Sequence, residues 1–315
     1  MGPVLTVLTI AAAVGAGLLL SRVPGVGRLS STRAYAAARM ALLGAMVGAM
    51  GFRIGRTPEV IHAAGALGLA SLAFAAATMA GTLAVLAAVF ALRGRRGRGR
   101  AGRAAAASAD DGSAGAWRDA ALLLGMLTAG FLVGRLVPVF PGARGETLVS
   151  ALLYALLVAI GFGLGGGDLP RLHLLVHPDL LVIPLGTAAG SLLGGLGAGL
   201  LLGMRPGGSL AVAAGFGWYS LSGVVLTRLD SPALGAVAFL SNMIRESLAL
   251  LLIPLLARGR FPLLAVGAGG ATSMDVTLPL IEKSCGAPSV PFAVASGALL
   301  SLSVPFLVPL LYALR

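Results

Sequence analysis

Charge, cysteine and aromatic residues are all scarce in this chain of 315 residues. Only 11% of the residues are charged, and Cys285 is the sole cysteine, so an intrachain disulfide and a thiolate metal site are excluded. The three histidines form no His-Glu-x-x-His pattern, and His62, His173 and His177 are expected at the surface. No metal, cofactor or catalytic residue is therefore predicted.

Apolar residues make up most of the chain instead. They make up 57% of the chain before its 47 glycines are counted, against about 45–50% with glycine in soluble domains. Apolar runs of about 20 residues recur, which is the length a helix needs to cross ~30 Å of hydrocarbon. The sequence predicts an all-α polytopic membrane protein with about 8–10 transmembrane helices. The candidate spans are 3–20, 34–52, 61–92, 119–139, 147–165, 179–203, 209–228, 233–257, 262–281 and 288–313.

The basic residues are concentrated in one segment. Seven of the 23 lie between Arg93 and Arg118, in a stretch rich in Gly, Ala and Ser without apolar periodicity. Segment 93–118 is predicted to be a disordered linker. It joins a three-span N-terminal part (1–92) to a C-terminal transport part (119–315). Its arginine run lacks the interleaved aromatic residues that stack on bases, so no nucleic-acid partner is expected.

The arginine distribution also predicts the orientation. Basic loops favour the cytoplasmic side, which puts the linker in the cytoplasm and, with ten spans, both termini outside. Arg53, Arg56, Arg258 and Arg260 are exceptions in that arrangement.

The first of three polar patches is the sequence GFGWYSLSG at 215–223. Its glycines and polar residues within an apolar stretch predict a helix that is interrupted inside the membrane, where freed backbone groups can bind a substrate. The alternative is close helix packing, with Trp218 and Tyr219 as interfacial anchors. The candidate binding residues are Trp218, Tyr219, Ser220 and Ser222.

The second patch places Asn242, Arg245 and Glu246 on an otherwise apolar span. On a helix, Arg245 and Glu246 lie three and four residues after Asn242, so each shares a flank with the amide. The patch is either a binding site or a buried charge network that fixes helix packing.

The third patch, GGATSMDVTLP at 269–279, carries Thr272, Ser273 and Asp275. A charge at membrane depth costs at least a few kcal/mol, so Asp275 is a candidate for substrate binding or proton transfer. Alternatively, it caps a buried half-helix. A weak internal echo, LAVAAG at 210–215 and LAVGAG at 264–269, precedes the first and third patches.

These three patches resemble the lysine exporter family LysO. The resemblance implies export of L-lysine, and of its analogue thialysine, across a bacterial inner membrane. It also implies kinship with transporters that have inverted repeats and discontinuous helices, here near 215–223 and 269–279. The site roles transfer to the candidate residues of the three patches.

The sequence thus predicts a multi-pass secondary transporter that exchanges L-lysine for protons and has membrane lipids as its surroundings. Asp275 and Glu246 would accept the ammonium groups of lysine, and Arg245 its carboxylate. Alternatives are a cation–proton antiporter, an exporter of another basic amino acid, a non-transporting receptor, and an intramembrane hydrolase with Ser220 or Ser273 as nucleophile.

Overall fold

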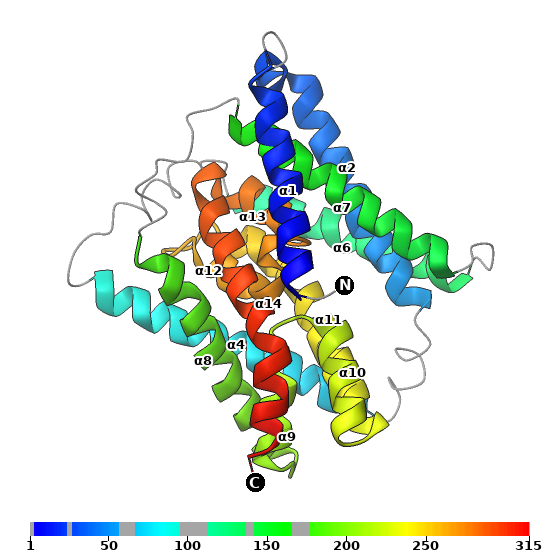
Figure 1. Ribbon diagram of the computed structural model, residues 1–315, viewed down its shortest axis with the longest axis vertical. Helices are drawn as coiled ribbons and strands as arrows, with labels where there is room; N and C mark the ends of the chain where they lie inside the picture. The colour runs from blue at the N-terminus through cyan, green and yellow to red at the C-terminus, as the bar shows by residue number, and fades with distance from the viewer. Residues whose placement is uncertain are drawn as a thin grey trace. The chain divides into compact units, whose positions relative to one another are not determined.

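The computed structural model describes residues 3–23, 27–56, 67–94, 113–136, 142–165 and 177–314, and within these ranges all regular structure is helical (Figure 1). Four helices are long and apolar enough to cross a membrane: Gly68–Arg93, Asp179–Leu201, Pro232–Leu256 and Ala287–Tyr312. Shorter apolar helices cover Ala12–Ser21, Leu124–Leu136 and Ser150–Gly163. The prediction of an all-α polytopic membrane protein is confirmed.

The chain forms two compact units. Unit 1 comprises Met1–Pro58 and Trp117–Leu175, and unit 2 comprises Glu59–Ala116 and Val176–Arg315. The third predicted span therefore packs with the C-terminal part, because α4 (Gly68–Gly94) lies along α8 (Asp179–Leu201) and α11 (Pro232–Leu256). Helix α6 begins at Ser113, within the predicted linker 93–118, and residues 95–112 of that linker lie outside the described residues.

Unit 1 is built by close backbone packing of its helices. It contains α1 (Pro3–Ser21), the 3-10 turn η1 (Gly27–Ser31), α2 (Arg33–Arg56), most of α6 (Ser113–Leu136) and α7 (Gly142–Gly165). A Cβ atom at Gly17 would meet the α7 backbone, and one at Gly161 would meet the α1 backbone. Small residues that let backbones approach are the usual means of helix association in membranes.

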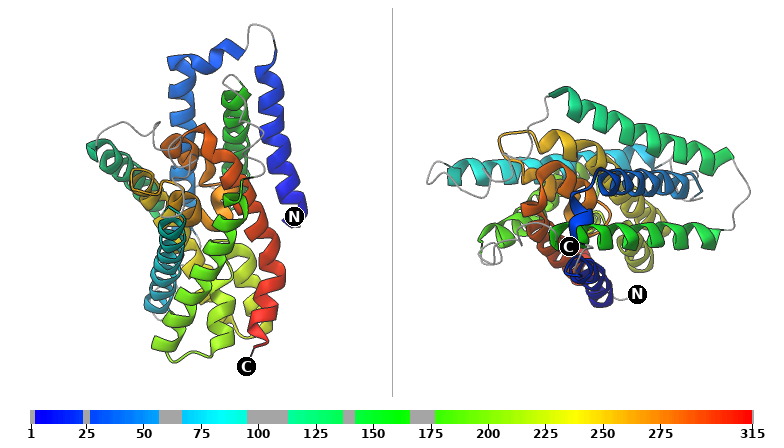
Figure 2. Two further views of the ribbon diagram at one scale, coloured as in Figure 1. Left: turned by 90° about the vertical axis from the view of Figure 1, so that its left-hand side faces the viewer. Right: turned by 90° about the horizontal axis from the view of Figure 1, so that it is seen from above.

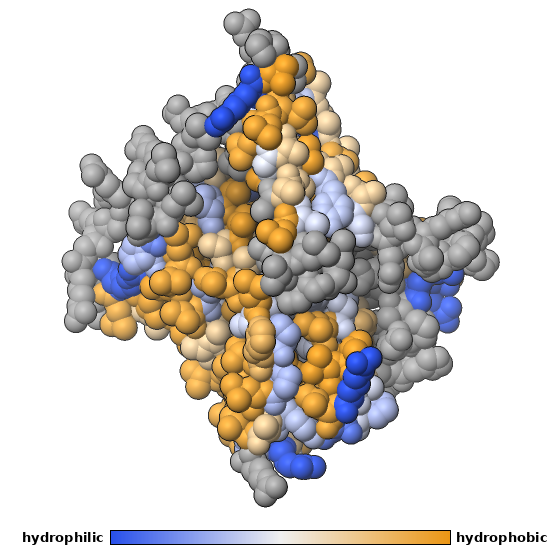
Figure 3. Space-filling view, in the orientation of Figure 1, coloured by the Kyte–Doolittle hydropathy of each residue, from blue (hydrophilic) through white to orange (hydrophobic). Residues whose placement is uncertain are grey.

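Unit 2 holds the four long apolar helices α4, α8, α11 and α14 (Val290–Tyr312). Apolar side chains cover much of the described surface in the lower half of Figure 3. The exposed apolar residues of α8 include Leu181, Leu185, Leu193 and Leu200. Apolar side chains left outside on such helices suit a lipid environment, where no hydrophobic gain follows from burying them against protein.

A first re-entrant hairpin lies between α8 and α11. It consists of α9 (Pro206–Ala213), a tip at 214–218 and α10 (Tyr219–Leu229). Both outer ends lie beside the end of α14: a Cβ atom at Gly207 would be 3.0 Å from the Tyr312 carbonyl oxygen, and the Tyr312 hydroxyl donates to Asp230 at 2.7 Å. The segment therefore enters and leaves unit 2 at the same end, here called the C-terminal end (Figures 1 and 2).

A second re-entrant hairpin lies between α11 and α14. It consists of α12 (Leu264–Gly269), the 3-10 helix η3 (Gly270–Met274) and α13 (Leu278–Cys285), and η4 (Ala287–Ser289) then leads into α14. The Cys285 sulfur lies 3.5 Å from the Pro262 carbonyl oxygen, so the two ends of the hairpin are adjacent. The rings of Phe261 and Phe90, near the end of α4, are 5.9 Å apart. This opposite end of unit 2 is called the linker end.

The two interruptions that the sequence predicted are present, but the segments 209–228 and 262–281 turn back rather than cross. In the first tip, Phe216 and Gly217 have φ values of 49° and 104°, and in the second Gly270 has φ 60°. These left-handed conformations reverse the chain over a few residues. The ten-span arrangement is therefore wrong at these two segments, and the lower end of the predicted 8–10 range is favoured.

Candidate functional site

The two hairpin tips meet inside unit 2. The Ala271 amide of the second tip donates to the Phe216 carbonyl of the first, with an N···O distance of 2.9 Å. Ser191, halfway along α8, donates to the Ala213 carbonyl at 2.9 Å, and Ser301, halfway along α14, donates to the Ala271 carbonyl at 3.4 Å. Polar backbone groups at this depth are tolerated where other protein groups form hydrogen bonds with them. The hydrogen bonds between the tips, and from α8 and α14, therefore hold the crossing of the tips in place.

Asn242 of α11 holds the first tip in place. Its Oδ1 accepts from the Gly217 amide at 2.8 Å, and its Nδ2 donates to the carbonyls of Ala238 and Val212 at 2.9 and 3.2 Å. A further 3.4 Å contact joins Nδ2 to the Ser222 hydroxyl. The carboxamide of Asn242 thus bonds to protein groups that hold the tip, and its predicted part in substrate binding stays a prediction.

Arg245 lies one helical turn further along α11 and faces both tips. Its side chain is among the largest that are fully buried. A Cβ atom at Gly270 would lie 2.5 Å from Nη1, and one at Gly217 would lie 3.7 Å from it, so the two tip glycines leave room beside the guanidinium. Among the described residues, Nη2 donates to Thr82 at 3.4 Å, and Nε and Nη1 have no hydrogen-bond partner.

Two threonines that the sequence did not mark are linked to this arginine: Thr82 contacts it, and Thr187 lies next to Thr82. Thr82 of α4 donates to the backbone carbonyl of Thr187 on α8 at 3.3 Å. Thr187 is fully buried, and its own hydroxyl has no partner in the described part of the chain. Threonine is common in apolar helices, and no signal in the sequence distinguishes these two from the others.

Thr272 and Ser273 bond to backbone at the second tip. The Thr272 hydroxyl donates to the Gly269 carbonyl at 2.9 Å, and the Ser273 hydroxyl lies 2.8 Å from the carbonyls of both Gly270 and Ala293. These hydroxyls therefore hold the distorted 3-10 turn and tie it to α14. No described group next to Ser273 has the geometry of a general base, so its contacts are those of a structural serine.

Asp275 follows the second tip, immediately after η3. Its side chain is partly exposed, and its carboxylate accepts from the Val276 amide at 2.6 Å. Within the described ranges it forms no ion pair. The bond to the next residue does not cap α13, which has Thr277 at its N-cap position without a side-chain cap. The acid is therefore available to a ligand or a proton.

The remaining candidate residues differ in how deeply they are buried. Trp218 packs partly buried against the core of unit 2, and the Tyr219 ring meets Phe239 edge-on at 5.2 Å between centroids. Ser222 is buried and donates to the Trp218 carbonyl at 2.9 Å, whereas Ser220 is exposed. Glu246 is buried on α11 directly after Arg245.

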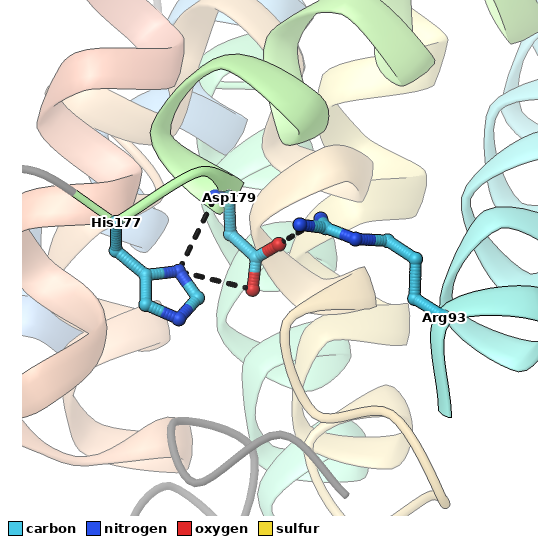
Figure 4. Close-up of polar contacts among 3 residues, drawn as sticks. All are labelled: Arg93, His177 and Asp179. Atoms are coloured by element: carbon cyan, nitrogen blue, oxygen red, sulfur yellow. Dashed lines mark hydrogen bonds and ion pairs between the residues drawn. The ribbon is translucent and has the colours of Figure 1, made fainter. Parts of the chain in front are cut away.

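A separate polar cluster lies at the linker end of unit 2 (Figure 4). Arg93, in the last turn of α4, forms an ion pair with Asp179, the first residue of α8. His177 Nδ1 accepts from the Asp179 amide at 3.2 Å, and its ring meets Phe292 edge-on at 5.6 Å. His177 is partly exposed, as expected, while His62 and His173 lie outside the described residues. This cluster fixes α4, α8 and α14 at one end.

Comparison with known proteins places these features in a family. The chain is 36% identical to "Lysine exporter LysO" of Escherichia coli over 186 residues, 59% of this chain and 62% of the relative. It is also 36% identical to "Putative lysine exporter" of Haemophilus influenzae over 156 residues, 50% of this chain and 80% of that protein. The chain thus spans less than two thirds of the Escherichia coli relative. No solved structure matches. The family profile described as Lysine exporter LysO matches residues 124–312, and the chain belongs to this family.

Proposed function

We propose that this protein is a secondary transporter that exports L-lysine from the cytoplasm across the bacterial inner membrane in exchange for protons. The observation that carries the proposal is the meeting of two re-entrant hairpins, from opposite ends of unit 2, beside the buried guanidinium of Arg245. Secondary transporters place their substrate sites near the bilayer midplane at such interruptions. Lysine is proposed as the substrate because both relatives are named as lysine exporters.

The charges near the tips suit lysine, which carries two ammonium groups and one carboxylate at neutral pH. Arg245 is the cation for the carboxylate, and the acids Asp275 and Glu246 are the partners for the ammonium groups. Moving one net positive charge out against an inside-negative potential costs about 2.3 kcal/mol per 100 mV. One-for-one exchange with an incoming proton cancels that electrical work. Asp275 is the proposed proton carrier because it is partly exposed.

The proposed orientation has the linker end of unit 2 in the cytoplasm. Because the first hairpin is re-entrant, α11 runs back to the linker end, and Arg258 and Arg260 lie at the same end as Arg93, near the contact of Phe261 with Phe90. Two of the four exceptions to the positive-inside rule therefore join the basic side, while Arg228 moves to the other. The α12–α13 hairpin then enters from the cytoplasm and the α9–α10 hairpin from outside, where α14 also ends.

Replacement of Asp275 with Asn tests this function. The change removes the charge and nearly keeps the shape, so we expect lysine efflux that no longer responds to an imposed pH gradient. The assay is efflux of labelled lysine from proteoliposomes that contain the purified full chain, with pH gradients of both signs. Asp230→Asn, the same change at an exposed carboxylate, is the control and should transport like the wild type. Undiminished, pH-driven efflux by the Asp275 variant refutes proton coupling through this acid.

A cation–proton antiporter is the second candidate, because the Asp275 carboxylate lacks an ion-pair partner among the described residues. The same proteoliposomes separate the two functions. Sodium-dependent proton flux that ignores lysine supports the antiporter, whereas competition by lysine and thialysine supports the exporter.

A further inference from the structure

We infer that Thr82 of α4 and Thr187 of α8 form, together with Arg245, a subsite for the carboxylate of the transported amino acid. The inference deepens the proposed function and rests on it. It assigns a substrate contact to α4, which precedes the region of the family match at 124–312. It also implies that the exporter recognises amino acids by their carboxylate and discriminates against the corresponding amides and amines.

Unsatisfied polar atoms occur on Arg245 and on Thr187, and Thr82 contacts both residues. Within the described ranges, Arg245 Nε and Nη1 and the Thr187 hydroxyl are buried without a partner. A buried donor or acceptor left unpaired costs about 1–3 kcal/mol, and more when it is charged. Native proteins rarely keep several such groups together without a functional reason. The cluster therefore indicates a group that binds there during the transport cycle.

The chemistry of these atoms selects an anion. Guanidinium nitrogens donate and cannot accept, and a threonine hydroxyl can add one more donor. The contacts that Thr82 makes to Arg245 and to the Thr187 carbonyl are long, at 3.4 and 3.3 Å, so its hydroxyl can turn to a better acceptor. The Thr187 hydroxyl has no partner among the described residues and is free to do the same. Arginine is the side chain best suited to planar carboxylates. A bound cation is disfavoured because the guanidinium would repel it.

The position of the cluster suits a transported ligand. Arg245 Nη1 faces Gly217 of the first tip and Gly270 of the second, neither of which carries a Cβ atom. Thr82 contacts the guanidinium from α4, and Thr187 of α8 lies next to Thr82. A carboxylate bound at Arg245 is thus next to both hairpins, and the rest of the amino acid can extend along the second tip toward Asp275.

The test compares lysine with lysinamide, in which a neutral amide replaces the carboxylate. Proteoliposomes that contain the wild-type protein are loaded with lysine. Each compound is then tested as an inhibitor of the counterflow of labelled lysine. A hydrogen bond to a charged group contributes about 1.5–3 kcal/mol, so lysinamide should need at least about a tenfold higher concentration than lysine. Equal inhibition by the two compounds overturns the inference without affecting lysine export.

Two variants test the threonines themselves. Thr82→Val and Thr187→Val should raise the half-inhibitory concentration of lysine about tenfold and leave that of lysinamide unchanged. The preference for lysine over lysinamide is then lost. Thr78→Val is the matched control, because Thr78 lies one turn before Thr82 on α4 and bonds to the Ala75 carbonyl of its own helix. A purely structural role shifts both compounds equally and overturns the inference.

Failure of the proposed function gives a different result. If the wild type shows no lysine counterflow, lysine export is refuted, and the subsite is tested with acetate against acetamide. Acetate should then raise the melting temperature of the wild type and not that of Thr187→Val, with acetamide inactive on both. Absence of stabilisation by acetate overturns the subsite as well.

Discussion

Gly270 is the residue at which a single methyl group should separate the two hairpin tips. Replacement with Ala places a Cβ atom 2.5 Å from Arg245 Nη1 and even closer to the Phe216 carbonyl oxygen. Backbone cannot yield as a flexible side chain can, so the second tip must move away from the first. The residue also has φ 60° and ψ −129°, a conformation that L-residues with a Cβ rarely adopt.

The expected loss of stability follows from these contacts. A residue held in a sparsely populated backbone conformation costs about 1–3 kcal/mol. Separation of the tips breaks the 2.9 Å bond from the Ala271 amide to Phe216, which contributes about 0.5–1.5 kcal/mol. We therefore expect Gly270→Ala to lose about 2–4 kcal/mol, with a lower melting temperature in detergent and loss of lysine counterflow.

Gly197 offers a control for this substitution. It lies on α8, and a Cβ atom there would meet nothing within 4 Å. Alanine is also the better helix former, so Gly197→Ala should melt at or slightly above the wild-type temperature and transport normally. Wild-type melting and counterflow for Gly270→Ala would refute the close crossing of the tips, and normal counterflow with lowered stability would refute its role in transport.

Two further predictions concern the first hairpin and its outer end. Asn242→Ala leaves the buried Gly217 amide without its acceptor, which should cost about 1–3 kcal/mol and abolish counterflow, as measured by thermal melting and labelled lysine. Hydrogen bonds from Ser231 and then Tyr312 hold the pKa of Asp230 below its usual range, so they stabilise the fold above the unfolded pKa and lose this effect as pH falls through the folded value. Tyr312→Phe should therefore melt below the wild type at pH 7, with a difference that shrinks as the pH falls below about 4 and disappears below the folded pKa; a difference that persists in acid would refute the charge-dependent bond.

The helices of this fold could be predicted because bilayer thickness imposes their length and polarity. Each predicted span corresponds to described helical structure, and the interruptions near 215–223 and 269–279 are real. Their direction could not be predicted, because the 24 residues from Pro206 to Leu229 are long enough to cross. One signal was available: Arg258 and Arg260 contradicted the charge rule only while the segment of the first patch was counted as a crossing.

The charged part of the candidate site could be picked out in the sequence, because a charge in an apolar span is conspicuous. Arg245 stands out in an apolar span and does lie beside both tips. Asn242 was equally conspicuous, yet its amide is used to hold the Gly217 backbone, because an interrupted helix needs partners for its freed groups. The inferred role of Thr82 and Thr187 could not be predicted, since only the fold brings Thr82 to Arg245 and Thr187 to Thr82.

The echo between LAVAAG and LAVGAG has a structural counterpart in the hairpins. The first copy ends α9 at the tip, and the second is α12 itself, so matching sequences enter unit 2 from opposite ends and finish where the tips meet. The charges do not follow this symmetry, because Asp275 belongs to the second hairpin alone. In the proposed function, protonation of that acid therefore changes the energy of the second hairpin alone. If proton exchange is measured, the single acid predicts that it depends on the hairpin that begins at the linker end, so that Asp275→Asn removes it while substitutions of polar residues in the first tip do not.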